Sequence, residues 1–170
     1  MHDFAVANIR SSALVFNPSP MSQAYFEKLT AEVIRLYPEY ARNPEDIRWN
    51  KGNGVFLCIE ANGAIRGHIF GDSQEIQHKC YEIAVRKVLQ VWRTGYHTGR
   101  FEELVFSGKL DEGAFGISKP TYIGWEGGVP LRTPDGLLVA AAFSGFRGVM
   151  DIEIIERAAV AVGLTTVART

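Results

Sequence analysis

The sequence predicts an α+β protein in which an antiparallel sheet of about five strands is flanked by helices. Two pairs of short apolar runs are each joined by turn residues, Asn62-Gly63 in the first pair and residues 133–136 in the second. Apolar residues at helical spacing occur before, between and after these pairs. Hairpins separated by helices favour an α+β domain over the strict strand-helix alternation of a doubly wound fold.

The length and composition indicate one ordinary globular domain over residues 1–170. The chain has 18 basic and 19 acidic side chains, giving a net charge of -1, which argues against a nucleic-acid-binding surface. Cys58 and Cys80 lie in apolar runs without metal-site spacing, so we expect buried thiols outside any disulfide. No stretch approaches the roughly 20 apolar residues of a membrane span, and the amino terminus lacks a secretory pattern. We therefore expect a cytoplasmic protein with no membrane or nucleic-acid partner.

The first helix is predicted over residues 23–40, with Ser22 as its N-cap and Pro38 marking its end. Residues 41–54 are polar and turn-rich and indicate a connector. A hairpin follows over residues 54–70, because Asn62-Gly63 readily adopts the positive φ angles of a tight turn. Apolar residues at helical spacing support the first helix: Phe26, Leu29, Val33 and Leu36.

The strongest helical pattern covers residues 75–95, with Asp72 or Ser73 as its cap. Its apolar stripe consists of Ile76, Cys80, Ile83, Ala84, Val88, Val91 and Trp92. A short helix over residues 99–107 and a loop over residues 108–120 come next.

The second hairpin joins strands over residues 127–132 and 137–143, followed by a last helix over residues 151–163. Alternation puts small or apolar side chains on both faces of the second strand, so both faces can be buried. Asp151 lies near the positive end of the last helix.

Several short motifs follow one another between residues 83 and 151. "IAVRK" ends at Lys87, Thr98 follows eleven residues later, and "GGVP" and "LLVAAAFSG" precede Asp151 and a helix. Over residues 20–163 the sequence resembles the GlcG/HbpS-like family, which includes heme-binding proteins and the carboxy-terminal domain of PduO-type proteins. The resemblance implies a profilin-like fold with α/β/α layers and assembly into a dimer or larger ring. It also implies heme or a related tetrapyrrole as a ligand.

Lys87 lies at the edge of the long helix's apolar stripe. Its stem either covers core surface while the ammonium reaches water, or the cation binds an anionic group, as the match to the family's lysine implies. At the exit of this helix, Arg93, Tyr96, His97 and Arg100 are close together in sequence. They either bind a carboxylate, propionate or phosphate, or they end the helix.

The histidines are scattered and have no zinc-site spacing. If heme is bound, His97 is the first choice for its metal ligand, followed by His78 and His68. A solvent-facing or hydrogen-bonded structural role is the alternative for each.

Small residues mark two strand ends, Gly127-Gly128 and Ser144-Gly145, where a backbone or a ligand can approach closely. Ser144 is not in a nucleophile elbow, and a turn or capping role suits it better. Asp72, Glu126 and Asp151 are carboxylates that become general bases only if they are desolvated.

The leading hypothesis is an oligomeric protein that binds a small ligand between the helix exit and these two segments. The alternative is an enzyme for a small anionic metabolite, with Lys87, Arg93 and Arg100 positioning it and Tyr96 or His97 moving a proton. A third interpretation is a structural subunit in which the small-residue strand serves assembly alone. The predicted ligand-binding residues are Lys87, Arg93, Tyr96, His97, Thr98, Arg100, Gly127, Gly128, Ser144 and Gly145.

Overall fold

A computed structural model describes residues 20–59, 63–118 and 124–168 of the chain. Its five-stranded sheet has the order β2-β1-β4-β3-β5, and every neighbouring pair is antiparallel. The predicted fold class is confirmed. The helices are α1 (Pro20–Tyr40), α2 (Pro44–Asn50), α3 (Gln74–Thr94), α4 (Thr98–Phe106) and α5 (Gly148–Ala161), with a 3-10 turn η1 (Glu112–Phe115). The strands are β1 (Gly54–Ile59), β2 (Ile65–Phe70), β3 (Gly128–Arg132), β4 (Leu138–Ser144) and β5 (Thr165–Thr166).

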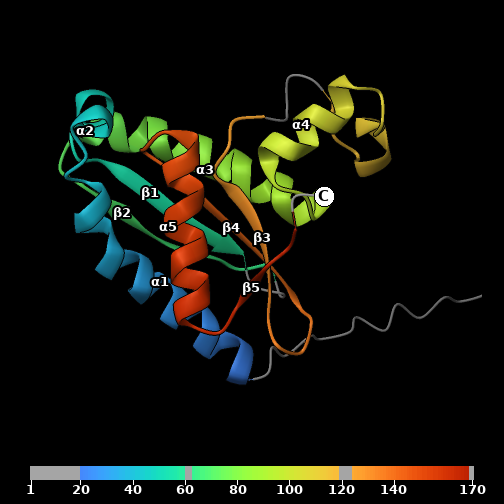
Figure 1. Ribbon diagram of the computed structural model, residues 1–170, viewed down its shortest axis with the longest axis horizontal. Helices are drawn as coiled ribbons and strands as arrows, with labels where there is room; N and C mark the ends of the chain where they lie inside the picture. Colours follow the sequence, from blue (N-terminus) through green and yellow to red (C-terminus); the bar gives the residue numbers. More distant parts are fainter. Residues whose placement is uncertain (1–19, 60–62, 119–123, 169–170) are drawn as a thin grey trace, which may run out of the picture.

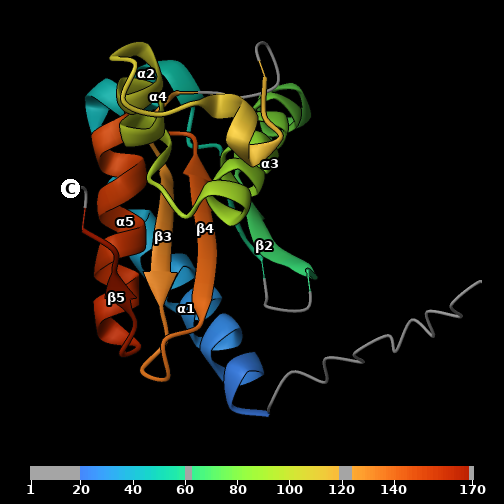
Figure 2. The ribbon, with the colours of Figure 1, turned by 90° about the vertical axis from the view of Figure 1, so that its right-hand side faces the viewer.

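Helices cover both faces of the sheet. In Figure 1, α1 and α5 lie in front of the sheet, and Figure 2 shows α3 on the opposite face. Two cores result, one between the sheet and α1 with α5, the other between the sheet and α3. The predicted α/β/α layers are thus present.

Strand β4 lies in the middle of the sheet and is buried on both faces, as predicted. Ala140 and Ala142 face α3, whereas Val139, Ala141 and Phe143 face α1 and α5. The small side chains let α3 pack closely against the strand, because alanine projects only one methyl group from the sheet. The end of β4 is thereby fixed between α3 and the start of α5.

The predicted start of the first helix and the role given to Pro38 are wrong, whereas the predicted last residue, Tyr40, is confirmed. The helix begins at Pro20, so Ser22 is not its cap. Proline suits the first helical position because its φ angle is already helical and its missing N–H needs no partner there. Pro38 does not end the helix, since Ala41 still donates to Tyr37 O and buried Tyr40 anchors the last turn through its hydroxyl bond to Glu153.

The connector predicted over residues 41–54 contains a helix, α2. Asn43 caps it by accepting the Glu45 N–H at 3.0 Å, and Pro44 occupies its first position. Lys51 ends the helix in the left-handed conformation. The polar composition gave no signal for a helix of only seven residues, whose last residue, Asn50, donates to Gly145 O just after β4.

The predictions for the remaining elements agree closely with the structure. Ser73 occupies the N-cap position of α3 without a side-chain cap bond. Both predicted hairpins are present, although Asn62 of the first turn lies outside the described residues. Trp92 is wrongly placed in the buried stripe, since it is 44% exposed on the flank of α3. The last helix begins at Gly148, three residues before the predicted start, because Arg147 is its N-cap residue. Within the described part of the chain, no helix combines the length and hydropathy needed to cross a bilayer.

Candidate functional site

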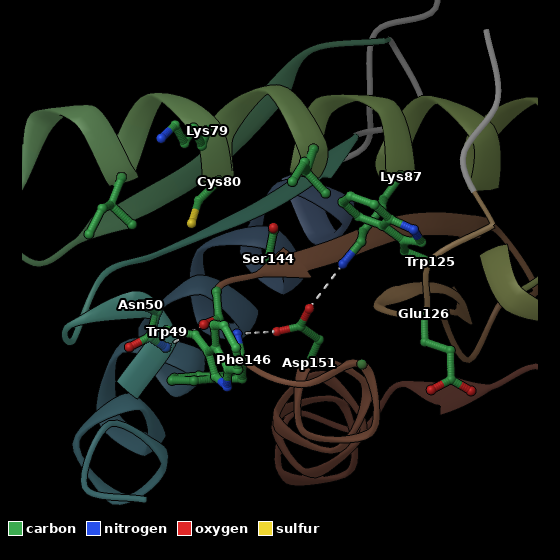
Figure 3. Close-up of a pocket in the computed structure, with 14 residues that line it drawn as sticks. Trp49, Asn50, Lys79, Cys80, Lys87, Trp125, Glu126, Ser144, Phe146 and Asp151 are labelled. Carbon is green, nitrogen blue, oxygen red and sulfur yellow. Dashed lines mark hydrogen bonds and ion pairs between the residues drawn. The ribbon is translucent and has the colours of Figure 1, made fainter. Parts of the chain in front are cut away.

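A pocket of about 600 Å³ opens between α2, α3 and the segment that joins β4 to α5. Figure 3 shows its lining, with α3 above and the start of α5 below. Trp125 and Glu126, which precede β3, complete one side. The exposed lining is mostly apolar, with walls from Ile76, Ile83 and Phe146.

At the pocket floor, Lys87 of α3 meets Asp151 of α5. The Lys87 Nζ donates to Asp151 Oδ2 at 2.9 Å and to the Phe143 carbonyl oxygen at 3.0 Å. The two side chains are only 3% and 2% exposed. The alternative in which Lys87 extends its ammonium into water is therefore wrong. A buried pair of this kind adds little stability by itself, because desolvation of the two charges offsets their attraction.

The carboxylate of Asp151 is held from two directions. Its Oδ1 accepts the Phe146 N–H at 2.9 Å, while Oδ2 accepts from Lys87. Burial raises the pKa of Asp151 to about 7, although Lys87 and the Phe146 N–H act to lower it. Nearby Asp46 also raises this pKa by like-charge repulsion.

A second carboxylate, Asp46 of α2, supports the start of α5. Its Oδ1 accepts the Arg147 N–H at 2.8 Å and contacts the Arg147 guanidinium at 3.2 Å. Asp46 and Asp151 thus accept hydrogen bonds from the N–H groups of the two residues before α5, where the helix dipole favours negative charge.

Gly127 makes room for the ion pair. It has a φ angle of +118°, and an added Cβ would lie 2.6 Å from Lys87 Nζ and 2.9 Å from Asp151 Cβ. Any side chain here would collide with both charged groups. As predicted, the missing side chain of Gly127 permits a close approach. The groups that approach it include Lys87 and Asp151.

Two side chains between α3 and β4 add further polar atoms. Cys80 of α3 and Ser144 of β4 both line the pocket (Figure 3), and the Ser144 hydroxyl acts to lower the pKa of the thiol. Burial, followed by the charge of Asp151, raises the pKa of Cys80, which therefore stays a neutral thiol. The buried state predicted for Cys58 and Cys80 is confirmed.

The structure brings only part of the predicted binding set together. Lys87, Ser144 and Gly145 line the pocket. Gly127 lies directly behind the ion pair, and Gly128 donates its N–H to Thr98 Oγ1 at 3.2 Å. Thr98 therefore joins α4 to the start of β3 and does not line the pocket.

The basic cluster at the helix exit lies away from the pocket: Arg93, Tyr96, His97 and Arg100 are not among its lining residues. His97 is buried, with Nε2 2.9 Å from the Val167 carbonyl oxygen. Arg100 pairs with Glu103 on the same helix at 2.7 Å. These residues are close in sequence, but the contacts of His97 and Arg100 are with Val167, just after β5, and with Glu103 of α4.

The other predicted groups have separate positions. His68 contacts the Phe70 ring on edge strand β2, and His78 is exposed on α3. Asp72 is exposed before α3, whereas Glu126 lines the pocket and packs against Gly148. Within residues 20–59, 63–118 and 124–168, no three His, Cys, Asp or Glu side chains gather as a metal site.

Among the pocket residues that sequence reasoning missed are its two tryptophans, Trp49 and Trp125. They are 73% and 63% exposed, and they lie on different sides of the pocket opening in Figure 3. The signal for Trp49 was Asn43-Pro44, a helix-start pattern that would have placed it on α2. Exposed tryptophans that line a pocket offer large flat surfaces to a ligand.

Comparison with solved structures identifies the fold. The chain has the fold of HbpS. A crystal structure of a double mutant of Streptomyces reticuli HbpS matches 95% of this chain and 99% of its own, with a TM-score of 0.62 at 13% identity. A crystal structure of PduOC in complex with heme matches 85% of this chain and 96% of its own, with a TM-score of 0.59 at 18% identity. No protein-family model and no curated protein matches the sequence.

The fold likeness to PduOC raises the question of whether this pocket suits heme. None of its described lining residues is a histidine, and Cys80 is held as a neutral thiol, whereas a heme-iron ligand is an imidazole, a thiolate or a similar donor. The described lining residues of this pocket therefore do not fit coordination of heme iron, although its apolar walls do not exclude the porphyrin itself.

Proposed function

We propose that this protein binds a small molecule in the pocket above Lys87 and Asp151. The observation that carries the proposal is the hydrogen bonding of Lys87. An ammonium group has three N–H donors, and two of them meet Phe143 O and Asp151 Oδ2. In the described residues the third has no acceptor within hydrogen-bond distance. A buried donor without a partner costs about 1–3 kcal/mol, which an acceptor oxygen on a ligand would recover.

The surroundings of the ion pair indicate what kind of molecule suits the pocket. The walls are mostly apolar, and two tryptophans lie at the opening. Lys87 is matched by Asp151, so the floor requires no net charge from its ligand. These features favour a molecule with an apolar, flat body and one hydrogen-bond acceptor.

The predicted alternative, an enzyme that positions a small anion with three cations, has less support. Arg93 and Arg100 do not line the pocket with Lys87. Tyr96 and His97 lie with them near α4, away from the carboxylate at the floor. A general base, if there is one, is better sought beside Lys87.

Tryptophan fluorescence tests the proposal directly. The chain has three tryptophans, and two of them, Trp49 and Trp125, line the pocket. In a Trp92→Phe background, a bound ligand should quench the remaining emission with saturation, and Lys87→Met should weaken this response. The matched control is Lys109→Met, an exposed lysine outside the pocket. Quenching that is equal in the Lys87 and Lys109 variants would contradict the role of Lys87.

Heme is the specific ligand that the fold likeness to PduOC supports, and it remains a proposal for this chain. Titration with hemin should give a saturable Soret shift if heme binds. Loss of the shift in Lys87→Met would put heme in the pocket, and loss in His97→Ala would put it at the exit of α3. A normal shift in both variants would remove these two residues from the site.

We also propose that the protein assembles with itself in the cytoplasm. Ile65 and Ile69 of edge strand β2 are exposed on the face that packs on α3. Trp92 of α3 is also exposed, and its ring lies near Gly63, two residues before β2. Exposed apolar residues next to an open sheet edge are typical of an interface. The buried thiols of Cys58 and Cys80 support the reducing compartment.

A further inference from the structure

We propose that Lys87 and Asp151 form a proton-transfer centre that acts on neutral, unsaturated carbonyl compounds with an acidic C–H next to the carbonyl group. In this centre Asp151 is the general base, and Lys87 holds the carbonyl oxygen. The inference rests on the proposed function, because it requires that a ligand occupies the pocket. It adds a reaction and a substrate class.

The geometry leaves both groups able to act. Each oxygen of the Asp151 carboxylate accepts one hydrogen bond, from Phe146 N–H or from Lys87. A carboxylate oxygen has two lone-pair sites, so capacity for a proton remains on each. The Lys87 Nζ, which carries this third N–H, lies 2.9 Å from Asp151 Oδ2. A carbonyl group bound to that N–H therefore brings its neighbouring carbon close to the base.

The surroundings make Asp151 a stronger base than an exposed aspartate. Burial raises its pKa to about 7, which puts half of the carboxyl groups in the basic form near neutral pH. The charged groups that act on it are Lys87 of α3 and Asp46 of α2, and the titratable Cys80 of α3, whose pKa Asp151 raises, lies in the same pocket. Glu126 lines the same pocket.

The proposed reaction balances without a cofactor. A carboxylate oxygen of Asp151 takes the proton from the carbon beside the carbonyl group. The electron pair of the broken C–H bond forms a carbon–carbon double bond, and the carbonyl π electrons move to oxygen, where Lys87 stabilises the negative charge. Asp151 then returns the proton to the same carbon or to a conjugated one, which gives exchange or isomerisation.

A purely structural role explains the pair less well. Replacing such buried ion pairs by apolar residues is often neutral or stabilising. Here the pair additionally requires a glycine with a positive φ angle at position 127, and it lies at the floor of an open pocket. The requirement for Gly127 and the burial of two charges thus occur at a position where a ligand in the pocket can reach Lys87 and Asp151.

The probe for this activity is 2-tetralone, a neutral bicyclic ketone whose C1 protons lie between the carbonyl group and an aromatic ring. In D₂O, removal and return of these protons replaces them with deuterium, and the proton NMR signal disappears. The wild-type protein should exchange them about 100-fold faster than Asp151→Asn, the usual contribution of a general base. After subtraction of the protein-free rate, which hydroxide raises in every sample, the exchange rate should rise with pH up to about 7 in the wild type and not in the variant.

Two further variants show whether a loss of exchange activity reflects the missing base or a loss of folding. Lys87→Gln with Asp151→Asn removes both charges together, so that no uncompensated charge is buried, and it too should lack exchange activity. Asp135→Asn changes an exposed turn aspartate and should leave the rate unchanged. Circular dichroism shows whether each variant is folded.

Binding of 2-tetralone, measured by tryptophan quenching in the Trp92→Phe background, separates the two proposals. Binding with an exchange rate equal in wild type and folded Asp151→Asn overturns the proton-transfer centre and leaves the binding pocket standing. Absence of binding to the wild type overturns the proposed substrate class. If exchange is fast and is lost in both Asp151 variants, the proton-transfer centre is supported.

Discussion

Asp151 connects three parts of the molecule through one carboxylate. It belongs to the first turn of α5, accepts the Phe146 N–H that follows β4, and pairs with Lys87 of α3. A change at this residue therefore affects both the electrostatics of the pocket and the packing of two layers. These effects separate when pH is the variable, because pH changes the charge of the carboxyl group without removing its side chain.

The first prediction concerns the stability contributed by Asp151. Because burial raises its pKa from 3.8 to about 7, the folded state binds this proton more tightly than the unfolded state. The contribution is fully present below the unfolded pKa and is lost as pH rises to about 7. The unfolding free energy of wild type minus that of Asp151→Asn should therefore fall between pH 4 and pH 7. Urea denaturation measures it, and a rising difference would contradict the direction of the shift.

The second prediction concerns Gly127. Alanine here combines a positive φ angle with contacts of 2.6–2.9 Å to Lys87 Nζ, Phe143 O and Asp151 Cβ. Gly127→Ala should lower the unfolding free energy by about 3 kcal/mol. Gly136→Ala is the matched control, since Gly136 has a φ angle of +86° and no atom within 4 Å of an added Cβ. It should cost about 1 kcal/mol. Equal losses in thermal unfolding would show that crowding of the ion pair is unimportant.

At the scale of elements, helix α2 forms one wall of the pocket although it has only seven residues. It is too short to be stable alone, so its cap and its contacts with neighbouring segments maintain it. Asn50 at its end donates to Gly145 O and accepts the Gly52 N–H, which ties the helix to the end of β4.

The third prediction follows from the cap of α2. Asn43→Ala removes the bond from Glu45 N–H and should destabilise the protein by about 1 kcal/mol. Because Trp49 moves with α2, this variant should also weaken quenching by a bound ligand. Ser73→Ala is the control, since Ser73 occupies the N-cap of α3 without a side-chain cap bond. Similar melting temperatures for the two variants would indicate that contacts alone maintain α2.

The elements that the sequence predicted well are those governed by local pattern. The hairpins follow from turn residues, and α3 follows from its apolar stripe and Gly95 at its end. The site was less predictable because its partners are distant in sequence: Lys87 and Asp151 are 64 positions apart. Each was singled out separately, but no local signal pairs them. Conversely, Arg93 and His97 are near Lys87 in sequence yet do not share its pocket.

At the scale of the whole molecule, the sheet is covered unevenly. Helix α3 packs on β1, β4 and β3, and β2 remains at the edge with its two isoleucines exposed. The opposite edge is protected by the short strand β5. The open edge is thus the part of the sheet best placed to meet another copy of the chain.

The fourth prediction tests this edge. Ile69→Lys puts a charge on the exposed face of β2, so an assembly formed there should dissociate to the monomer. Val160→Lys is the control, because Val160 is an exposed apolar residue on α5, away from the edge. Light scattering coupled to gel filtration gives the mass of each. A wild-type monomer, or an assembly that survives Ile69→Lys, would contradict the interface.

The pairing of β1 with β4 also has a consequence for the order of folding. Val55 lies opposite Ser144, so this pairing joins distant parts of the chain, whereas the hairpins and helices form from local contacts. Until it forms, we expect Lys87 and Asp151 to be exposed to water and unpaired. The desolvation of both charges is thus delayed until the sheet closes. A ligand that requires the pair should therefore bind only to chains that have completed folding, which makes ligand binding a measure of the last step of refolding.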